Sequence, residues 1–318
     1  MCIRDRAIHN RLMQVVRDYE IARLVSAAIS DGRQHAAQIS YGQDRRPLEV
    51  SATPMERHGG VAVLLITRDL SELYRLERVR REFVANVSHE LRTPLASVKA
   101  SVETLQGAAA NDPAATAEFL EHVNTEVDQM SSLVQELLDL ATLEAGKAQL
   151  APAPTDMTPL INSAADRVRP RASRQGISIE VDVPASLPVV LADRPAVDRV
   201  MQNLLDNALK FTPPDGHIDV TARASEEAVE VSVSDTGEGI LPEHLPHVFE
   251  RFYKTDPSRS TVGTGLGLAL VKHTVQALGG TIEARSQPGE GSVFLFTLPK
   301  ANGRFADSRP GTTSLNSP

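Results

Sequence analysis

The chain has 318 residues, of which 41% are hydrophobic and 23% are charged, an ordinary composition for two or three soluble domains. Its formal net charge of −8 argues against nucleic acid as the main partner, because phosphate binding needs a basic surface. The single cysteine, Cys2, excludes an internal disulfide, and the longest apolar run, from Val61 to Ile66, is too short to span a bilayer.

The first part of the chain predicts a helix followed by three strands. Apolar residues at helical spacing cover residues 11–29, and strand-like runs separated by turn residues follow at 34–41, 46–53 and 60–68. This order resembles the end of a PAS domain whose first strands are missing. We therefore expect a partial PAS-like sensor domain over residues 7–70. A small unrelated α+β cap is the alternative.

A long helical pattern begins at Leu70 and continues without a break through the segment around His89. His89 falls on the side opposite to the apolar stripe, and Thr93, four residues later, shares its outward face. A lone outward histidine is usually part of a solvated helix face, so its meaning depends on the rest of the chain. The apolar stripe consists of Val84, Val87, Leu91, Leu95, Val98, Val102 and Leu105.

A second helix is predicted after residues 107–113, with Asp112 as its cap and Pro113 in its first turn. Together the two helices predict a dimerisation hairpin over residues 71–150. One hairpin cannot cover both apolar seams, so we expect a dimeric four-helix bundle. The second seam, which we expect to be core, consists of Leu120, Val123, Val127, Met130, Val134, Leu137 and Ala141.

Beyond a Pro-containing linker at 151–154, the pattern predicts an α/β sandwich over residues 155–300, with one mixed sheet and helices on one face. A polar, disordered tail is expected at 301–318. The fold class is thus multidomain α+β. The expected strands are 177–183, 189–192, 217–224, 228–234, 281–286 and 292–298, and the expected helices are 156–173, 194–211, 242–249 and 267–278.

Polar side chains in this last region have spacings that suit a nucleotide. Asn203, Asn207 and Lys210 form one helical stripe that suits a divalent cation and phosphate charge, although such a stripe is often only solvated. The segment beginning at Asp235 follows a strand and contains two glycines; it is either a tight turn or a site where a carboxylate accepts from an exocyclic amine. Alternating glycines at 263–267 precede a helix and can cradle phosphate.

Five motifs in this order resemble those of a sensor histidine kinase of a two-component system, and the likeness covers about residues 70–299. The partial PAS-like region and the long helix are most similar to the phosphate-responsive members. The motifs are the phosphoacceptor H box HELRTP (89–94), the N box NLLDNALKFT (203–212), the first glycine box DTGEGI (235–240), the F box FERFYK (249–254) and the second glycine box GTGLGL (263–268).

This resemblance implies that ATP and Mg²⁺ bind the C-terminal domain, with Asn207 as the Mg²⁺ ligand and with Asn203 and Lys210 near the phosphates. Asp235 is expected to accept a hydrogen bond from the adenine amine. The polar residues 253–262 are a candidate mobile lid. Further nucleotide contacts are implied for Gly237, Gly239, Gly263, Gly265, Gly267 and Leu268.

The resemblance also implies that His89 attacks the γ-phosphate, that Glu90 serves as its base, and that Thr93 positions water in a phosphatase reaction. The implied partners are a response regulator and a second copy of the chain, with no nucleic acid. The piece is expected to be cytoplasmic, the parent being anchored in a bacterial inner membrane through missing upstream segments. Whether a protomer phosphorylates its own histidine or that of its partner depends on the handedness of the 107–113 connection. The alternatives are a related ATPase of the gyrase or chaperone type, a protein serine kinase of the same nucleotide fold, and a non-catalytic signalling scaffold.

Overall fold

The computed structural model describes residues 18–42, 44–57, 60–106, 112–255 and 263–301. The chain divides into two compact units, residues 1–88 and 89–318. Helix α3 (Ser71–Gln106) contributes residues to both units. Within the described ranges, every helix is either too short or too polar to serve as a membrane span.

The first unit pairs one helix with an antiparallel sheet in the order β1-β2-β3, so that consecutive strands are neighbours. This is the order of elements that the sequence predicts. The helix begins later than expected, and residues 11–17 of the predicted helix lie outside the described residues. The elements are α2 (Tyr19–Asp31), β1 (His35–Tyr41), β2 (Arg46–Arg57) and β3 (Gly60–Asp69).

Helix α2 owes its ends to local chemistry. The Asp18 side chain accepts hydrogen bonds from the backbone N–H groups of Glu20 and Ile21, and Gly32 ends the helix with a φ of 68°. The apolar face of α2 packs on the sheet and forms a small core. That core consists of Ile21, Leu24, Ala28, Ile39, Val50 and Ala52.

Helices α3 and α4 (Pro113–Glu144) form the predicted helical pair. Helix α4 starts as expected, because the Asp112 carboxylate accepts from the N–H groups of Ala114 and Ala115. The connection at 107–111 lies outside the described residues. Much of the apolar seam remains exposed in the single chain, at steps of seven residues that are typical of a coiled coil. The exposed positions include Leu95, Val102, Leu120, Val127 and Val134.

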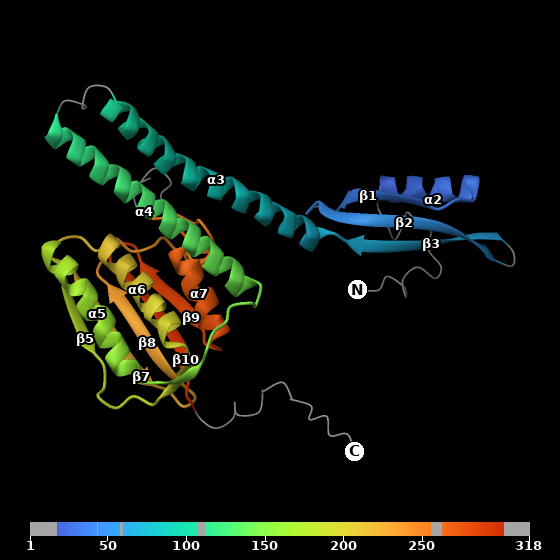
Figure 1. The fold of residues 1–318 in the computed structure, drawn as a ribbon. Helices are drawn as coiled ribbons and strands as arrows, with labels where there is room; N and C mark the ends of the chain where they lie inside the picture. Colours follow the sequence, from blue (N-terminus) through green and yellow to red (C-terminus); the bar gives the residue numbers. More distant parts are fainter. Residues whose placement is uncertain (1–17, 43, 58–59, 107–111, 256–262, 302–318) are drawn as a thin grey trace, which may run out of the picture. The chain divides into compact units, whose positions relative to one another are not determined.

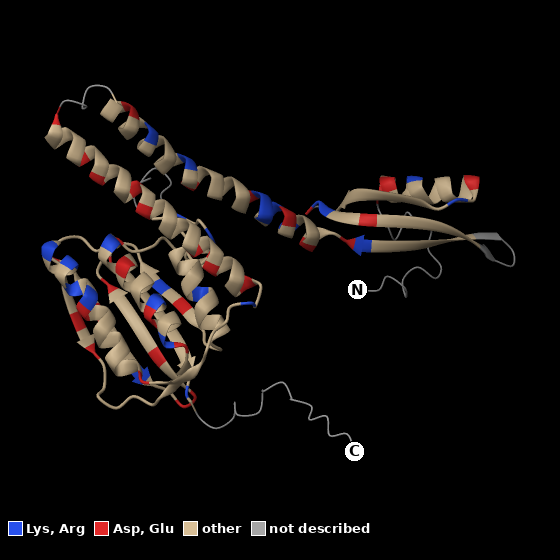
Figure 2. Cartoon of the chain, viewed as in Figure 1, with Lys and Arg blue, Asp and Glu red and all other residues tan. Residues whose placement is uncertain are grey.

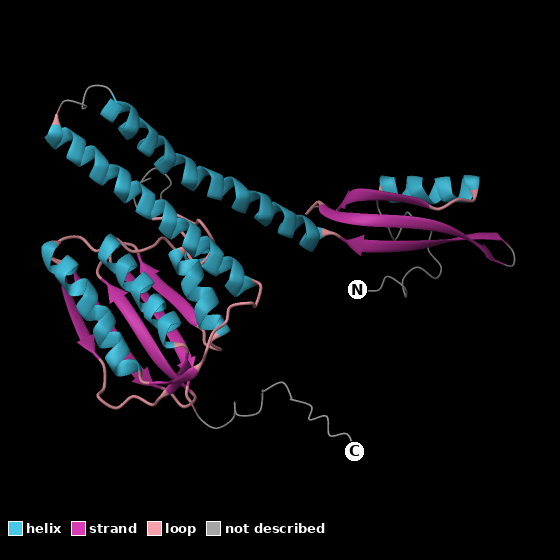
Figure 3. Cartoon of the chain, in the orientation of Figure 1, coloured by secondary structure: helices cyan, strands magenta, loops and turns pink. Residues whose placement is uncertain are grey.

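The rest of the second unit is the expected sandwich. Its sheet has the strand order β5-β7-β8-β10-β9, with β5 and β7 parallel and the other neighbours antiparallel, and helices α5, α6 and α7 cover one face (Figure 1; Figure 3). The elements are β4 (Ala153–Thr155), α5 (Met157–Arg174), β5 (Ser178–Asp182), β6 (Val190–Ala192), α6 (Arg194–Phe211), β7 (His217–Ala224), β8 (Ala228–Asp235), a 3-10 turn (Leu245–His247), α7 (Gly267–Ala277), β9 (Ile282–Gln287) and β10 (Gly291–Pro299).

Aliphatic side chains build most of the core of this sandwich, together with Phe294 and Phe296. Strand β8 alternates strictly, with Val229, Val231 and Val233 buried and polar residues between them. Helices α5 and α6 carry charged residues of both signs (Figure 2). Two ion pairs join these helices, Arg167 with Asp198 at 2.5 Å and Arg171 with Asp206 at 2.9 Å.

Two predicted elements differ in the structure. The helix expected at 242–249 is wrong: only the 3-10 turn Leu245–His247 forms there. The backbone N–H groups of His244, His247 and Glu250 each bond the carbonyl three residues earlier, and Pro246 has no N–H to extend a helix. The predicted linker is also partly ordered, because Ala153 to Thr155 pair with β6.

Candidate functional site

Asp235 stands at the end of β8, in the middle of the sheet, and its side chain is buried. Burial raises the pKa of this carboxyl above its ordinary value, while hydrogen bonds from the backbone of Gly237 and Ser292 act in the opposite direction. The N–H of Gly237 lies 2.8 Å from the carboxylate. A buried acceptor at the end of a strand is the kind of group that recognises one polar edge of a flat ligand.

The backbone around Asp235 requires its glycines. A Cβ at Gly237 would lie 2.5 Å from the carbonyl oxygen of Phe211, the last residue of α6. Gly239 has a φ of 70°, and a Cβ there would lie 2.1 Å from the carbonyl oxygen of Gln287 on β9. Side chains at these two positions would push the segment away from both neighbours.

The polar stripe of α6 meets the second glycine segment at the start of α7. Residues on one side of α6, such as Leu204, are buried in the core, which leaves Asn203, Asn207 and Lys210 half-buried on the other side. The Asn203 amide nitrogen donates to the carbonyl of Arg199 at 2.9 Å. Its amide oxygen lies 2.7 Å from where a Cβ of Gly267 would stand. Two motifs separated by some sixty residues in the sequence are therefore in contact.

Lys210 brings positive charge to the same place. Its ammonium nitrogen would lie 2.9 Å from a Cβ at Gly263, and it stands 4.5 Å from the centre of the Phe211 ring. Burial, and then the neighbouring charge of Lys254, lower the pKa of Lys210 below its ordinary value. Two cations held together in partial burial favour an anion between them.

The rest of the second glycine segment is held by the F box. Gly265 has a φ of 71°, its carbonyl accepts from the N–H of Phe252 at 2.9 Å, and a Cβ on it would lie 2.7 Å from the Phe252 backbone. Leu268 is half-buried and packs against the main core. The predicted lid at 253–262 lies mostly outside the described residues, which end at Thr255 and resume at Gly263.

The H box lies on α3. His89 is exposed, as the sequence predicts, and the Thr93 hydroxyl, one turn on, is 3.4 Å from the His89 carbonyl oxygen. The Glu90 carboxylate is half-buried and lies 2.6 Å from the ammonium of Lys254 in the F box. Sequence reasoning assigned no role to Lys254 and did not foresee this ion pair, because 164 residues separate its members.

Sequence reasoning also missed a row of acidic residues on α4. Glu136 accepts from the Thr264 hydroxyl at 2.8 Å, Asp139 pairs with Arg199, and Glu144 pairs with Arg251 at 2.5 Å. Burial raises the pKa of Glu136, with the Thr264 hydrogen bond opposing it. The apolar side chains between these contacts form a separate cluster that includes Leu133, Leu140, Leu266, Ala269 and Leu270.

Two parts of the chain match known protein families. Residues 192–302 match the family described as the histidine kinase-, DNA gyrase B- and HSP90-like ATPase, and residues 79–146 match the His Kinase A (phospho-acceptor) domain. The second of these matches contains His89, and the first contains the N box, the F box and both glycine boxes. The chain therefore carries the phosphoacceptor domain and the ATPase domain of histidine kinases.

Two curated sensor proteins match most of this chain. The chain is 32% identical to the alginate biosynthesis sensor protein KinB of Pseudomonas aeruginosa over 297 residues, which cover 91% of this chain and 49% of KinB. It is 36% identical to the sensor-like histidine kinase SenX3 of Mycobacterium tuberculosis over 238 residues, covering 74% of this chain and 58% of SenX3. The chain thus spans about half the length of these relatives.

Solved structures agree with the fold. The Acinetobacter baumannii histidine kinase AdeS has a TM-score of 0.55 at 25% identity and covers 67% of this chain and 98% of its own. Full-length ShkA in complex with AMPPNP has a TM-score of 0.54 at 34% identity, and the match covers 69% of this chain and 46% of ShkA. ThkA, solved in complex with the response regulator TrrA, shares the fold at a TM-score of 0.56 and 22% identity, over 93% and 88% of the two chains.

Proposed function

We propose that this chain transfers the γ-phosphoryl group of ATP to His89 and then passes it to an aspartate of a response regulator. One observation carries the proposal: the Asn203 and Lys210 side chains meet the second glycine segment, and the end of α6 packs against Gly237, next to buried Asp235. An adenine acceptor and a phosphate-binding region then lie in one domain, which shares a compact unit with the exposed His89.

For the nucleotide, we assign Asp235 as the acceptor for the adenine amine and Gly237 and Gly239 as the close backbone around the ring. Asn203 and Lys210 lie where phosphate charge is favoured, because burial and Lys254 already disfavour the charged form of Lys210. The second glycine segment, Gly263, Gly265, Gly267 and Leu268, supplies backbone N–H groups and the amino end of α7.

Mg²⁺ would neutralise charge on the phosphates when bound. We assign Asn207 as its protein ligand. An amide oxygen suits this hard cation, and Asn207 lies on the same half-buried stripe as Lys210, one turn before it. A single protein ligand is typical of Mg²⁺ sites, in which the substrate and water provide the rest.

In the transfer, a ring nitrogen of His89 attacks the γ-phosphorus while the bond to the leaving ADP oxygen breaks. We assign Glu90 as the group that orients the ring or accepts its proton. In this structure the Glu90 carboxylate is held by Lys254 at 2.6 Å. We therefore propose that Glu90 must leave Lys254 before it can act on His89.

We propose a response regulator as the protein partner and a second copy of the chain as the dimerisation partner. The exposed seam on α3 and α4 supports the dimer, and the exposure of His89 supports access by both partners. Thr93 lies one turn from His89, and we assign it a role in removing phosphate from the regulator. The order of domains that we propose is sensor (7–70), hairpin (71–150), ATP-binding (155–300) and tail (301–318). We further propose that upstream segments anchor the parent protein in a bacterial inner membrane.

Incubation with γ-labelled ATP and Mg²⁺ tests the kinase. We expect an acid-labile, base-stable label on the protein that is lost in His89→Ala and in Asn207→Ala. As a control, His122→Ala changes another histidine of the helix pair and should leave labelling unchanged. Labelling that survives in His89→Ala would overturn the proposal.

The phosphatase role needs a separate measurement with a phosphorylated regulator. We expect Thr93→Ala to autophosphorylate normally but to dephosphorylate the regulator more slowly, by roughly tenfold or more, since positioned groups contribute 10²–10⁴-fold in such steps. Thr104→Ala, which removes a hydroxyl bonded to its own helix at 2.8 Å, is the matched control. Equal dephosphorylation by both variants would remove the assignment of Thr93.

A further inference from the structure

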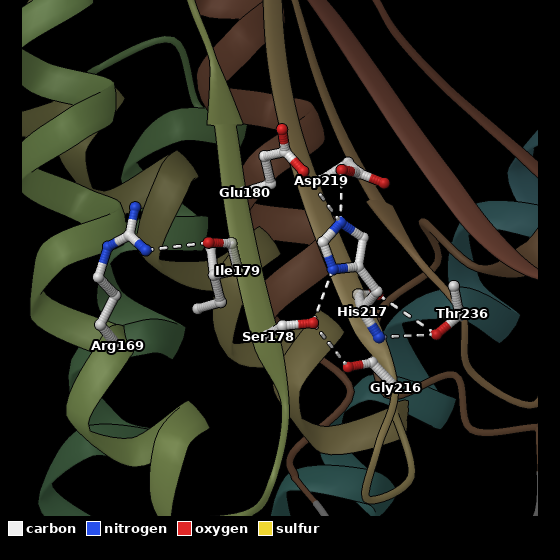
Figure 4. Close-up of polar contacts among 8 residues, drawn as sticks. All are labelled: Arg169, Ser178, Ile179, Glu180, Gly216, His217, Asp219 and Thr236. Atoms are coloured by element: carbon white, nitrogen blue, oxygen red, sulfur yellow. Dashed lines mark hydrogen bonds and ion pairs between the residues drawn. The ribbon is translucent and has the colours of Figure 1, made fainter.

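The outer face of the ATP-binding sheet carries a second polar cluster, which contains none of the residues assigned to the nucleotide. Strands β5 and β7 run parallel at one edge of the sheet, with Ser178 opposite His217 and Glu180 opposite Asp219. Residues two apart in a strand share a face, so these four side chains point to the same side (Figure 4). Ile179, between Ser178 and Glu180, packs instead against the core.

Three of these side chains place ligand atoms close together. The Nε2 atom of His217 lies 2.8 Å from Oδ1 of Asp219 and 3.8 Å from Oε2 of Glu180. One nitrogen and two carboxylate oxygens all lie within 4.8 Å of one another. Ligands at about 2.0–2.1 Å from a tetrahedral zinc ion are roughly 3.3 Å apart, and the two observed separations bracket that value.

The fourth side chain orients the imidazole. Nδ1 of His217 lies 2.7 Å from the Ser178 hydroxyl oxygen, and that hydroxyl donates to the Gly216 carbonyl at 3.3 Å. Because the serine hydrogen is directed to Gly216, its oxygen can accept from Nδ1–H, which leaves the Nε2 lone pair for a cation. Metal-bound histidines ordinarily have a hydrogen-bond acceptor of this kind on their other ring nitrogen.

The backbone of His217 is fixed as well. Its N–H donates to the Thr236 hydroxyl at 2.8 Å, and its carbonyl accepts from the Thr236 N–H at 3.1 Å. Thr236 directly follows Asp235 in the first glycine box. The ring is therefore held on a strand that is connected to the nucleotide segment, not on a mobile loop.

An ordinary surface ion pair does not account for this arrangement. Glu180 and Asp219 are like charges directly opposite on neighbouring strands, a pairing that is destabilising unless a cation lies between them. Elsewhere, His35 at the start of β1 forms a simple pair at 2.8 Å with Asp31, the last residue of α2, four residues earlier. In His217, by contrast, one ring nitrogen lies near two carboxylates and the other near a serine hydroxyl. A simple surface ion pair has one carboxylate on one nitrogen.

We propose that Glu180, His217 and Asp219 bind a divalent cation of the zinc class on the outer face of the ATP-binding sheet. One imidazole and two carboxylates are ligands that Zn²⁺ accepts. The side chains of Glu180, Asp219 and His217 are 72%, 45% and 35% exposed, respectively. Solvent therefore reaches the site, and water completes the coordination. This site is separate from the Mg²⁺ position assigned to Asn207, and it does not depend on the proposed kinase activity.

Calorimetric titration of Zn²⁺ into the chelator-treated full chain, without nucleotide, tests the site. We expect His217→Ala and Asp219→Asn to lose one binding event or to weaken it at least tenfold. Ser178→Ala should weaken it by a smaller factor, because supporting partners of a metal ligand typically contribute about 10- to 100-fold. Zn²⁺ should also raise the melting temperature of the wild type but not that of His217→Ala.

Two variants are matched controls. His35→Ala removes a histidine that, among the described residues, pairs with one aspartate and no second carboxylate, and Asn207→Ala removes the assigned Mg²⁺ ligand. Both should keep the Zn²⁺ isotherm of the wild type, and Asn207→Ala should keep it while losing ATP labelling. Identical isotherms for wild type and His217→Ala, with circular dichroism showing both folded, would overturn the proposal. Equal losses in His217→Ala and His35→Ala would also overturn it, by showing non-specific binding.

Discussion

At the residue scale, the proposed nucleotide site contains two titratable side chains whose surroundings disfavour the charged form. Asp235 is buried and has a raised pKa, while Lys210 is half-buried beside Lys254 and has a lowered pKa. In each case the folded chain disfavours the charged form that a polar ligand would use. Such arrangements cost stability when no ligand is bound and are typical of binding sites.

We predict that Asp235→Asn weakens adenine nucleotide binding by about 10- to 100-fold, because a hydrogen bond to a charged group contributes about 1.5–3 kcal/mol. Calorimetry with a non-hydrolysable ATP analogue measures this loss. Asp182→Asn, on the exposed end of edge strand β5, is the control and should bind as the wild type does. Wild-type affinity in Asp235→Asn would contradict the assignment of the adenine acceptor.

The same substitution has a stability effect whose sign follows from the raised pKa. The folded chain holds the Asp235 proton to higher pH than the unfolded chain does, whose pKa is near 3.8. Stability is therefore lost as the pH rises from about 3.8 through the folded pKa. We expect the stability of Asp235→Asn, relative to wild type, to increase from pH 4 to pH 7 in urea unfolding. A difference that is flat or falls with pH would contradict this.

Gly265→Ala tests the contact between the second glycine segment and the F box. Gly265 and Gly289 both have positive φ angles, 71° and 80°, but only at Gly265 would a Cβ meet backbone, that of Phe252 at 2.7 Å. We expect Gly289→Ala to cost about 1 kcal/mol from the conformation alone. Gly265→Ala should cost clearly more in chemical denaturation, and it should also weaken ATP binding. Equal costs would show that the segment can move away from Phe252.

At the scale of elements, α4 has two different surfaces. One contacts α7 through a cluster that includes Leu133, Leu140, Leu266 and Leu270, with the polar contacts of Glu136, Asp139 and Glu144 around it. The other carries the exposed seven-residue repeat. A helix with two apolar surfaces needs partners on both, and in the single chain the surface with the seven-residue repeat remains exposed.

We predict that Leu140→Ala destabilises the second unit by about 2–5 kcal/mol, because Leu140 is 1% exposed and its loss leaves a cavity between α4 and α7. Leu241→Ala is the matched control, since this leucine is 48% exposed and should change stability by about 0.5 kcal/mol or less. Urea unfolding of both variants makes the comparison. A small effect of Leu140→Ala would mean that α4 and α7 separate readily.

At the scale of the whole molecule, the proposed bundle requires a second copy of the chain. Leu120, Val127 and Val134 repeat every seven residues on α4 and remain exposed, as do Leu95 and Val102 on α3. Two seams of this kind are covered when two hairpins associate. Dimerisation would also bring a second exposed His89 into the same particle.

We predict that Val127→Glu weakens the dimer by at least tenfold, because it places a charge in the centre of the seam. Light scattering after size-exclusion chromatography, over a range of protein concentrations, measures the dissociation. Gln129→Glu adds the same charge on the opposite side of α4 and should remain dimeric. If both variants dimerise as the wild type does, the seam is not the dimer interface.

Local patterns predicted much of this protein. The spacing of apolar residues and caps such as Asp112 predicted helices α3 to α7 and all the strands of the main sheet. The helix predicted at 242–249 was wrong. The wrong helix shows the limit of spacing: prolines at 242 and 246 remove hydrogen-bond donors, and the residues instead form turns. The strand Ala153–Thr155 exists only because β6 lies beside it.

The sequence alone predicted the family resemblance, the class of chemistry and the candidate side chains of the five motifs, because motifs such as HELRTP and DTGEGI are local in the chain. Only the tertiary structure decided which of them meet. The pairs Glu90 with Lys254 and Asn203 with Gly267, and the cluster of Glu180, His217 and Asp219, join residues far apart in sequence. Such contacts depend on packing and strand register, which no local pattern records.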